Sequence, residues 1–417
     1  MVIGRLEDED LTDIGLPPLT HNDTLACPGG VHSGTCTRSD LLRALKQQKP
    51  IFAPNQKSTY SNDAFELLGL ALENATGRDY SEYITEAILK PLNMSSTSFE
   101  TPSDDHAVLT RGQSAIWDVE EGVQRPTGGL YASAGDLSKF LRYILRHYNA
   151  IATGVNWLLP ASWSTEIHTF YGMPWEILRS NTVLEHSKRA VTIVTKSGGL
   201  PGYTSQILLL PEYDLGVTIL VAGNGTLLEE LRDIVLPGLI RAAEAAVWNH
   251  IANGYTKDMV TTSPHLNSSL SLEASPSRGL AIKSFISNGT DVLNTVIPRF
   301  LGLSLIPGSG SSWHAQLVPT LLFKDEKLQE GEIWRMVVVE NRVEKQSAHR
   351  LFDDFCLTDV DTTEYGGLPL NEVVFWHEVG LVELPAFRVK FKAAAQGEMP
   401  GLLWSSALRN LVQQVIG

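Results

Sequence analysis

Three strand-like segments in the middle of the chain, separated by short turns, constrain the fold more than any other feature. They span Ala190–Thr195, Tyr203–Leu210 and Gly216–Ala222, and the segment between Pro211 and Gly216 joins the last two as a hairpin. Before these strands the apolar residues recur at helical spacing, and well after them apolar and polar residues alternate. The chain is therefore predicted to be an α+β protein.

Helices are predicted where the apolar periodicity is bounded by capping residues. Ser39 and Ser133 are suited to cap helices, Gly77 is a left-handed terminator, and Pro91 stops the helix before it. The expected helices are Arg38–Gln48, Ser61–Thr76, Asp79–Leu89, Ala134–His147 and Leu227–Ala252.

The composition changes after the last of these helices. Residues Thr261 to Ser277 are rich in Ser, Thr and Pro, which predicts a linker. We expect a first domain over residues 1–255, a linker over 256–278 and a mainly antiparallel β domain over 279–417. The strands expected in that last domain are Trp313–Leu322, Ile333–Glu340, Glu372–Trp376 and Ala386–Phe391.

The charge balance limits the partners. The 417 residues carry a formal net charge of −14, which argues against nucleic acid and against anionic membrane surfaces. The most apolar stretch, Ile207–Ala222, is interrupted by Pro211, Glu212 and Asp214, so no membrane-spanning segment is predicted. The sequence does not indicate an oligomeric state.

Signals for the cellular compartment are mixed. The acidic first ten residues lack the apolar core of a signal peptide. Cys27 and Cys36 have a spacing that suits a small disulfide loop, although two free thiols would look the same, and Cys356 would be left over. Six Asn-x-Ser/Thr sequons favour a secreted ancestry and a glycoprotein; they lie at Asn22, Asn74, Asn93, Asn224, Asn267 and Asn288.

Two short motifs stand out. Tyr60-Ser61-Asn62 opens a predicted helix, and Lys196-Ser197-Gly198-Gly199 immediately precedes a strand of the hairpin. Taken singly, Tyr60 is more often an aromatic at a strand-to-helix junction, Asn62 a capping residue and Lys196 a solvated strand end. Their order and setting, with Gly129 on an intervening turn, favour a shared site.

The residue types in these motifs suit acyl chemistry. A Tyr phenol with a pKa of ~10 is a poor base at neutral pH, and a neighbouring ammonium such as Lys196 would favour the phenolate. Asn62 is suited to orient a substrate carbonyl or an amine. Glycine after the lysine lets a substrate lie against the strand edge, and the backbone N–H of Gly199 is suited to be half of an oxyanion hole.

These residues resemble the serine β-lactamase and penicillin-binding-protein superfamily, and within it fungal β-lactamase-like proteins akin to class C β-lactamases, esterases and acyltransferases. The resemblance covers about residues 15 to 395. It implies a β-lactamase/transpeptidase-like fold, with an antiparallel sheet flanked by helices, a helical lobe and an additional C-terminal antiparallel β domain. The matching segments are Tyr60–Gly77, Pro91–Thr97, Pro126–Ser133, Lys196–Ser205, Ser287–Leu293 and Asp361–Gly367.

The resemblance also implies roles. Tyr60 is then the general base and Lys196 the cation that tunes it, while Asn62, Ser197, Gly198 and Gly199 bind the substrate and the oxyanion. A small-molecule ester, thioester or amide would acylate a serine, and water or an alcohol would take the acyl group. Family members work without a metal or an organic cofactor, and no closely spaced His or Cys set here has zinc-ligand spacing. A tailoring role in fungal secondary metabolism is a further expectation.

One element of the family pattern is missing. No lysine in this chain has a serine three residues before it, so the Ser-x-x-Lys that supplies the nucleophile is absent. In the family this motif lies further upstream of Tyr-x-Asn than the 59 residues that precede Tyr60, and we therefore expect an N-terminally incomplete fold from a truncated gene product. One alternative is an inactive pseudoenzyme that binds acyl or peptide ligands. Another is an enzyme with a nucleophile from elsewhere in the chain, for which Ser58 and Ser61 are nearest to Tyr60.

Overall fold

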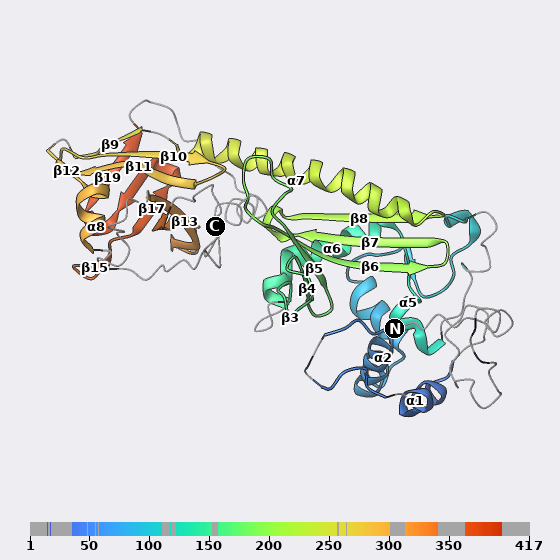
Figure 1. Cartoon of the computed structure of the whole chain (residues 1–417). Helices are drawn as coiled ribbons and strands as arrows, with labels where there is room; N and C mark the ends of the chain where they lie inside the picture. The colour runs from blue at the N-terminus through green and yellow to red at the C-terminus, as the bar shows by residue number, and fades with distance from the viewer. Residues whose placement is uncertain are drawn as a thin grey trace. The chain divides into compact units, whose positions relative to one another are not determined.

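The computed structural model describes residues 36–47, 49–54, 56, 58–110, 117, 122–151, 157–256, 258–263, 265–300, 313–340 and 363–393, together with Gly15 and Pro17. Figure 1 labels the helices and strands. The chain divides into two compact units. The first comprises Met1–Ser180, Thr192–Leu210 and Leu215–Leu236, and the second comprises Asn181–Val191, Pro211–Asp214 and Pro237–Gly417.

The first unit opens with three helices. These are α1 (Arg38–Gln47), α2 (Asn62–Thr76) and α3 (Tyr80–Ile84), and α3 continues into a π-helical turn over Thr85–Leu89. The cap predicted at Ser39 is wrong, because the first helix begins at Arg38 and the hydroxyl of Thr37 accepts the N–H of Asp40 at 3.3 Å. Helix α2 ends at Gly77, which has a left-handed φ of 69° and donates its N–H to the carbonyl of Glu73. The helices predicted over these three segments are thereby confirmed.

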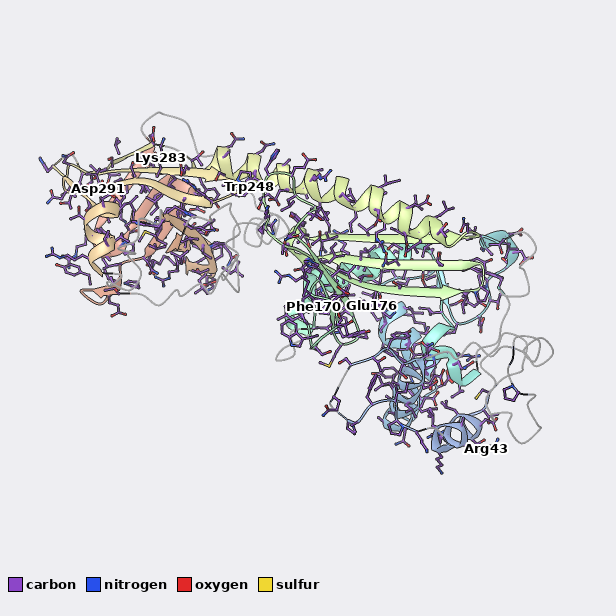
Figure 2. The ribbon with its side chains drawn as sticks, in the orientation of Figure 1. Arg43, Phe170, Glu176, Trp248, Lys283 and Asp291 are labelled. Carbon is purple, nitrogen blue, oxygen red and sulfur yellow. The ribbon has the colours of Figure 1, made fainter. Side chains whose placement is uncertain are left out.

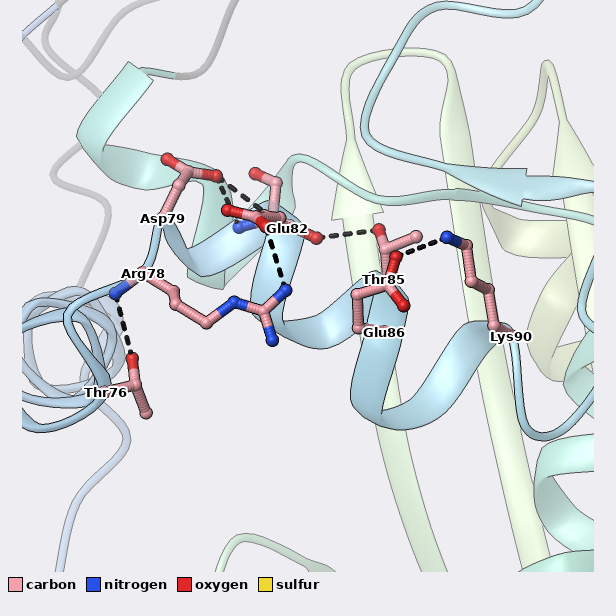
Figure 3. Close-up of polar contacts among 8 residues, drawn as sticks. Thr76, Arg78, Asp79, Glu82, Thr85, Glu86 and Lys90 are labelled. Atoms are coloured by element: carbon pink, nitrogen blue, oxygen red, sulfur yellow. Dashed lines mark hydrogen bonds and ion pairs between the residues drawn. The ribbon is translucent and has the colours of Figure 1, made fainter.

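Local side chains start α3, as Figure 3 shows. The carboxylate of Asp79 accepts hydrogen bonds from the backbone N–H groups of Ser81 and Glu82, at 2.9 and 3.2 Å. An N-cap of this kind is worth about 1 kcal/mol. The neighbouring ion pairs Arg78–Glu82 and Glu86–Lys90 have at least one partner that is largely exposed, so solvent screens them and they contribute little to stability. The cap therefore matters more than the charges.

A short connection leads from this helical part to the main sheet. It holds 3-10 turns over Asp104–His106 and Gly122–Gln124, the helix α5 (Arg125–Gly128) and a small ladder of β1 (Thr97–Ser98) with β2 (Tyr131–Ala132). Helix α6 (Ala134–Ile151) follows, and the hydroxyl of Ser133 accepts a hydrogen bond from the N–H of Asp136 at 3.2 Å. The predicted cap at Ser133 is confirmed.

The sheet of the first unit has six strands in the order β3-β4-β5-β6-β7-β8 among the described residues. The ladders β3–β4, β4–β5, β6–β7 and β7–β8 are antiparallel, which confirms the predicted hairpin. The strands are β3 (Ser162–Trp163), β4 (Thr169–Tyr171), β5 (Glu176–Ser180), β6 (Val191–Leu200), β7 (Tyr203–Leu210) and β8 (Leu215–Ala222).

Helix α6 covers the sheet and forms the core of the first unit with it. Leu141 and Ile144 from α6 pack with Ile177 of β5, Val194 of β6 and Leu209 of β7, and all five side chains are almost completely buried. The approach is close. A Cβ at Gly216 of β8 would lie 3.0 Å from the Cβ of Leu141, which explains the glycine there. Burial of each such side chain contributes roughly 1.5–3 kcal/mol.

Helix α7 (Thr226–Tyr255) carries Pro237 in its interior, where the boundary between the two units falls. Within the second unit, a polar cluster fixes the C-terminal part of this helix. The guanidinium of Arg189 contacts the carboxylates of Glu212 at 2.6 Å and Glu244 at 2.8 Å, and also the phenol of Tyr213 at 2.7 Å. Trp248, labelled in Figure 2, donates its indole N–H to Glu244 at 2.9 Å.

The second unit is built around a nine-stranded sheet in the order β10-β9-β19-β18-β17-β14-β13-β11-β12, with every ladder antiparallel. Strand β10 also pairs with β11, and this pairing closes all of these strands except β12 into a barrel. The strands are β9 (Asp258–Thr261), β10 (Ser269–Ser275), β11 (Gly279–Ser287), β12 (Thr290–Asp291), β13 (Trp313–Asp325), β14 (Glu330–Glu340), β17 (Glu372–Trp376), β18 (Leu381–Leu384) and β19 (Val389–Ala393).

One face of the barrel wall is a packed apolar core. The register places Trp334 opposite Val373, Phe375 opposite Val382, and Val382 opposite Phe391, and each of these side chains is at most 1% exposed. Small barrels of this size have an interior that side chains can fill. The remaining elements are a π-helical turn over Val292–Val296, α8 (Ile297–Phe300), a ladder of β15 (Glu364–Tyr365) with β16 (Leu368–Pro369), and 3-10 turns over Pro211–Tyr213, His377–Val379 and Pro385–Phe387.

Two sequence-based expectations need correction. The interval 256–278 is not a structureless linker, because it contains β9 and β10, and Leu270 and Leu272 of β10 are buried in the barrel. The strand expected over Ala386–Phe391 begins only at Val389, after a 3-10 turn. The outer limits 1–255 and 279–417 stay predictions. Cys36 is disulfide-bonded, and both other cysteines, Cys27 and Cys356, lie outside the described residues. Among the helices that are described, none is long and apolar enough to cross a bilayer.

Candidate active site

The start of helix α2 places Tyr60 and Asn62. The hydroxyl of Ser61, which is the N-cap in an extended conformation, accepts a hydrogen bond from the N–H of Ala64 at 3.2 Å. Tyr60 immediately before the cap packs against Phe65, with ring centroids 6.3 Å apart, in the arrangement of a hydrophobic staple. The sequence therefore fixes the direction in which the chain, and with it the phenol of Tyr60, enters the helix.

Strand β6 places the second motif. Lys196, Ser197, Gly198 and Gly199 lie inside this strand and pair with β7 from Ile207 to Thr204. The motif precedes β7 as predicted, but the strand expected to end at Thr195 continues to Leu200 and contains the motif. The end of β6 is set by its pairing with β7. It could not be predicted from the motif itself, because two glycines interrupt the alternation of apolar and polar residues there.

The two motifs meet in the first unit. The ammonium of Lys196 lies 4.6 Å from the centroid of the Tyr60 ring, within the range of a cation–π contact. The hydroxyl of Tyr60 donates a hydrogen bond to Oδ1 of Asn62 at 2.7 Å. Tyr60 is 43% exposed, so the phenol remains accessible to a ligand. Residues far apart in the sequence thus form one polar cluster, as the motifs predicted.

Glu176 joins this cluster, although no motif in the sequence singles it out. It is the first residue of β5 and is labelled in Figure 2. Its Oε1 lies 3.0 Å from Nζ of Lys196, and its Oε2 accepts a hydrogen bond from the hydroxyl of Ser197 at 3.2 Å. Nε2 of the buried Gln206 donates to the same hydroxyl at 3.2 Å. The only hint in the sequence was the apolar pair Trp175 and Ile177 on either side of Glu176.

The two glycines of the second motif differ in what surrounds them. A Cβ at Gly198 would lie 2.6 Å from Oγ of Ser205 on β7, so a side chain here would have to displace that hydroxyl. A Cβ at Gly199 would have no other atom within 4 Å, and the residue is exposed. An acyl group could therefore approach the backbone of Gly199, whereas Gly198 lies against the hydroxyl of Ser205.

An aromatic cluster lies at the end of the same hairpin. The ring of Trp117 is 5.0 Å from that of Tyr131 and 5.4 Å from that of Tyr203, the first residue of β7. The hydroxyl of Tyr203 donates to the carbonyl of Val108 at 3.0 Å. These contacts join the end of β6 and β7 to the connection that carries β2, and they supply an apolar wall to that end of the hairpin.

The two serines considered as replacement nucleophiles have other partners. Ser61 caps α2, and Oγ of Ser58 is hydrogen-bonded to Oγ of Ser162. Among the described residues, neither hydroxyl is hydrogen-bonded to a lysine. Within the same described residues, no three His, Cys, Asp or Glu side chains form a group that could hold a metal ion.

With the fold and the cluster in place, comparison with known proteins assigns the family. The chain belongs to the β-lactamase family, because residues 13–238 match the family model described as Beta-lactamase. Residues 248–395 match a second model, described as Beta-lactamase-like-like, C-terminal domain. The fold is accordingly β-lactamase/transpeptidase-like with an additional C-terminal antiparallel β domain, as the sequence resemblance predicted.

Curated relatives of the chain include fungal proteins named as hydrolases. A protein named probable hydrolase from Phoma sp. is 33% identical over 374 residues, which are 87% of this chain and 61% of that protein. The Beta-lactamase-like protein of Arthroderma benhamiae is 30% identical over 390 residues, covering 87% of this chain and 64% of its own length. The chain spans about three fifths of the length of the curated relatives it matches.

Among solved structures, the match to a beta-lactamase/D-alanine carboxypeptidase from Yersinia pestis complexed with citrate has 20% sequence identity and a TM-score of 0.39. It covers 49% of this chain and 62% of that chain. The family assignment therefore rests on the family models and not on this similarity.

Proposed function

We propose that this protein is a hydrolase or acyltransferase of the β-lactamase family whose site binds the acyl group of a small-molecule ester, thioester or amide. The observation that carries the proposal is the meeting of Tyr60, Asn62 and Lys196 at the exposed end of β6. A phenol, an amide and an ammonium in contact are the groups that proton transfer and carbonyl binding require.

Each group has one role in the proposal. Tyr60 exchanges a proton with the attacking or departing oxygen, and Lys196 stabilises negative charge on that phenol. Asn62 orients the phenol and the substrate carbonyl. The N–H of Gly199 donates to the carbonyl oxygen as negative charge develops on it, an interaction whose loss typically costs ~10²–10³ in rate. Ser197 and Gly198 hold the strand edge along which the substrate lies.

A second candidate function is non-covalent binding of an acyl or peptide ligand by the same residues. It is favoured by the absence of Ser-x-x-Lys from the sequence and by the engagement of Ser58 and Ser61 in other contacts. In that case Tyr60, Asn62 and Lys196 recognise the ligand without forming an acyl-enzyme.

The two candidates separate in one set of measurements on the full chain. Hydrolysis of a 4-nitrophenyl ester and labelling by a fluorophosphonate probe are followed together with saturable binding of a stable amide analogue. The variants are Tyr60→Phe and Lys196→Met, with Tyr83→Phe and Lys90→Met as matched controls outside the cluster. If the chain is a catalyst, the probe should label a serine. Tyr60→Phe should then lose at least tenfold in turnover, and Tyr83→Phe should not.

Binding without labelling, weakened by Lys196→Met and unchanged by Lys90→Met, would favour the second candidate. The proposed function would be refuted if the wild-type chain showed no turnover and no saturable binding.

Secretion, glycosylation and a tailoring role in secondary metabolism complete the proposal and are inferred from the sequence and the family resemblance. Glycosylation is supported by the exposure of five of the sequon asparagines, all of them among the described residues: Asn74, Asn93, Asn224, Asn267 and Asn288. Mass spectrometry of protein secreted by a fungal host tests it directly.

A further inference from the structure

The carboxylate of Glu176 uses both of its oxygens on the second motif. Oε1 lies 3.0 Å from the ammonium of Lys196, and Oε2 accepts the hydroxyl proton of Ser197 at 3.2 Å. The side chain of Lys196 is 23% exposed and that of Glu176 is 36% exposed, so the contact lies at the rim of the cluster, where a ligand would enter. Glu176 is the first residue of β5, and the fully buried side chain of Ile177 next to it fixes the start of the strand.

An ammonium beside a hydroxyl is a pair of donors suited to a carboxylate, because each oxygen of the anion can accept one hydrogen bond. Glu176 meets both donors in this way, and the ammonium of Lys196 also donates to the carbonyl of Ser197 at 2.8 Å. The amide of Gln206 donates to the oxygen of Ser197, so the one hydroxyl proton is directed to Glu176. The donors that would hold a carboxylate on a ligand are therefore already taken by a carboxylate of the chain itself.

The charges lead to the same conclusion. Glu176 neutralises Lys196, and a second carboxylate brought to these donors would face Glu176 at close range, where like charges repel. An uncharged acyl group needs neither donor, because its carbonyl can bind to the backbone at Gly199, around which there is open space.

We propose that Glu176 is an internal carboxylate that makes the site select uncharged acyl groups and reject those that carry a carboxylate beside the reacting carbonyl. The inference rests on the proposed acyl-binding function and names its substrate class, neutral esters, thioesters and amides. Glu176 is a specificity-determining residue in this account, since it acts by occupying Lys196 and Ser197.

The test compares two ligands that differ in one charge, phenylacetylglycine and its methyl ester. Their dissociation constants are measured at pH 7 and low salt by ligand-observed NMR titration of the full chain. The proteins are the wild type, Glu176→Gln, the double variant Glu176→Gln/Lys196→Met, and Glu82→Gln. The last removes a carboxylate that pairs with Arg78 on the exposed side of α3, and it controls for a change in net charge.

We expect the wild type to bind the ester at least tenfold more tightly than the acid. Glu176→Gln tightens binding of the acid at least tenfold, changes binding of the ester less than threefold, and loses the gain when Lys196 is also replaced. Glu82→Gln leaves the ratio of the two constants at the wild-type value.

A wild type that binds the acid as tightly as the ester, or a ratio unchanged in Glu176→Gln, would overturn the inference and leave the proposed acyl site in place. A third outcome is that the acid binds to Glu176→Gln but not to the double variant, while the ester binds to none of the proteins. This outcome would support the internal carboxylate and refute the acyl site. No binding of either ligand to any of the proteins would overturn both.

Discussion

The packing of α2 against α5 offers a sharp test of how the chain positions Tyr60 and Asn62. Gly69 lies in the middle of α2 and is buried, and a Cβ there would lie 2.4 Å from Cγ and 3.2 Å from Cβ of Pro126 in α5. A proline ring cannot rotate away, because it is tied to its own backbone. The substitution Gly69→Ala must therefore push the two helices apart.

The expected size of the effect is the difference between two terms. Overpacking costs about 1–3 kcal/mol, and the short approach to a rigid ring places Gly69→Ala near about 3 kcal/mol. Alanine in place of glycine inside a helix returns about 1 kcal/mol. The net loss of local stability is thus about 2 kcal/mol, which corresponds to roughly 30-fold faster amide exchange in α2.

Amide hydrogen exchange measured by mass spectrometry reports this change helix by helix. The matched control is Gly135→Ala at the start of α6, where a Cβ would find only Oγ of Ser133, 3.9 Å away. The control should leave exchange in α6 unchanged or slow it. If Gly69→Ala also leaves exchange in α2 unchanged or slows it, the close contact with Pro126 does not hold α2 in place, and the reasoning is refuted.

Three further outcomes follow from the described contacts. Ser61→Ala removes the N-cap of α2 and should lower the stability of α2, measured by amide exchange, by about 1 kcal/mol. Ester binding should also weaken because Tyr60 loses its anchor, and unchanged amide exchange would contradict the role of the cap. Arg189→Met should lower the free energy of unfolding of the second unit in urea by about 3–5 kcal/mol, since it removes the cation that compensates two partly buried carboxylates, and a loss below about 1 kcal/mol would show that the cluster is dispensable. Burial raises the pKa of Asp136, but hydrogen bonds from Lys139 and the segment Ser96–Thr97 outweigh it and hold that pKa below its ordinary value. Asp136 therefore stabilises the fold above about pH 4, the stabilisation is lost as pH falls through the lowered folded pKa, and Asp136→Asn should flatten the acid limb of a stability–pH curve measured by urea unfolding.

Most helices could be predicted because their signals are local. Gly77 and Ser133 act on backbone groups within a few residues, and the structure shows both in the predicted capping positions. The N-cap of α2 is Ser61 and not its neighbour Asn62, and Ser39 lies inside α1. The Tyr60 and Lys196 motifs could also be predicted to share a site, since each motif sits at the end of an element whose type the periodicity gives.

What the sequence could not give depends on contacts between distant segments. Strand β5 has only five residues, too few for a clear alternation, and so Glu176 was not recognised as a neighbour of Lys196. The Ser/Thr-rich interval read as a linker forms β9 and β10 because these strands complete the barrel, and their partners β11 and β19 lie later in the chain. In both cases tertiary pairing decides the local structure.

The most direct test of the central claim, that Tyr60 and Lys196 form one acyl-binding site, is a crystal structure of the full chain with the methyl ester of phenylacetylglycine bound. We expect an acyl carbonyl oxygen about 3 Å from the backbone nitrogen of Gly199, with the ester oxygen within hydrogen-bond reach of the Tyr60 hydroxyl. An ester bound elsewhere, with the contacts among Tyr60, Lys196 and Glu176 untouched, would contradict it.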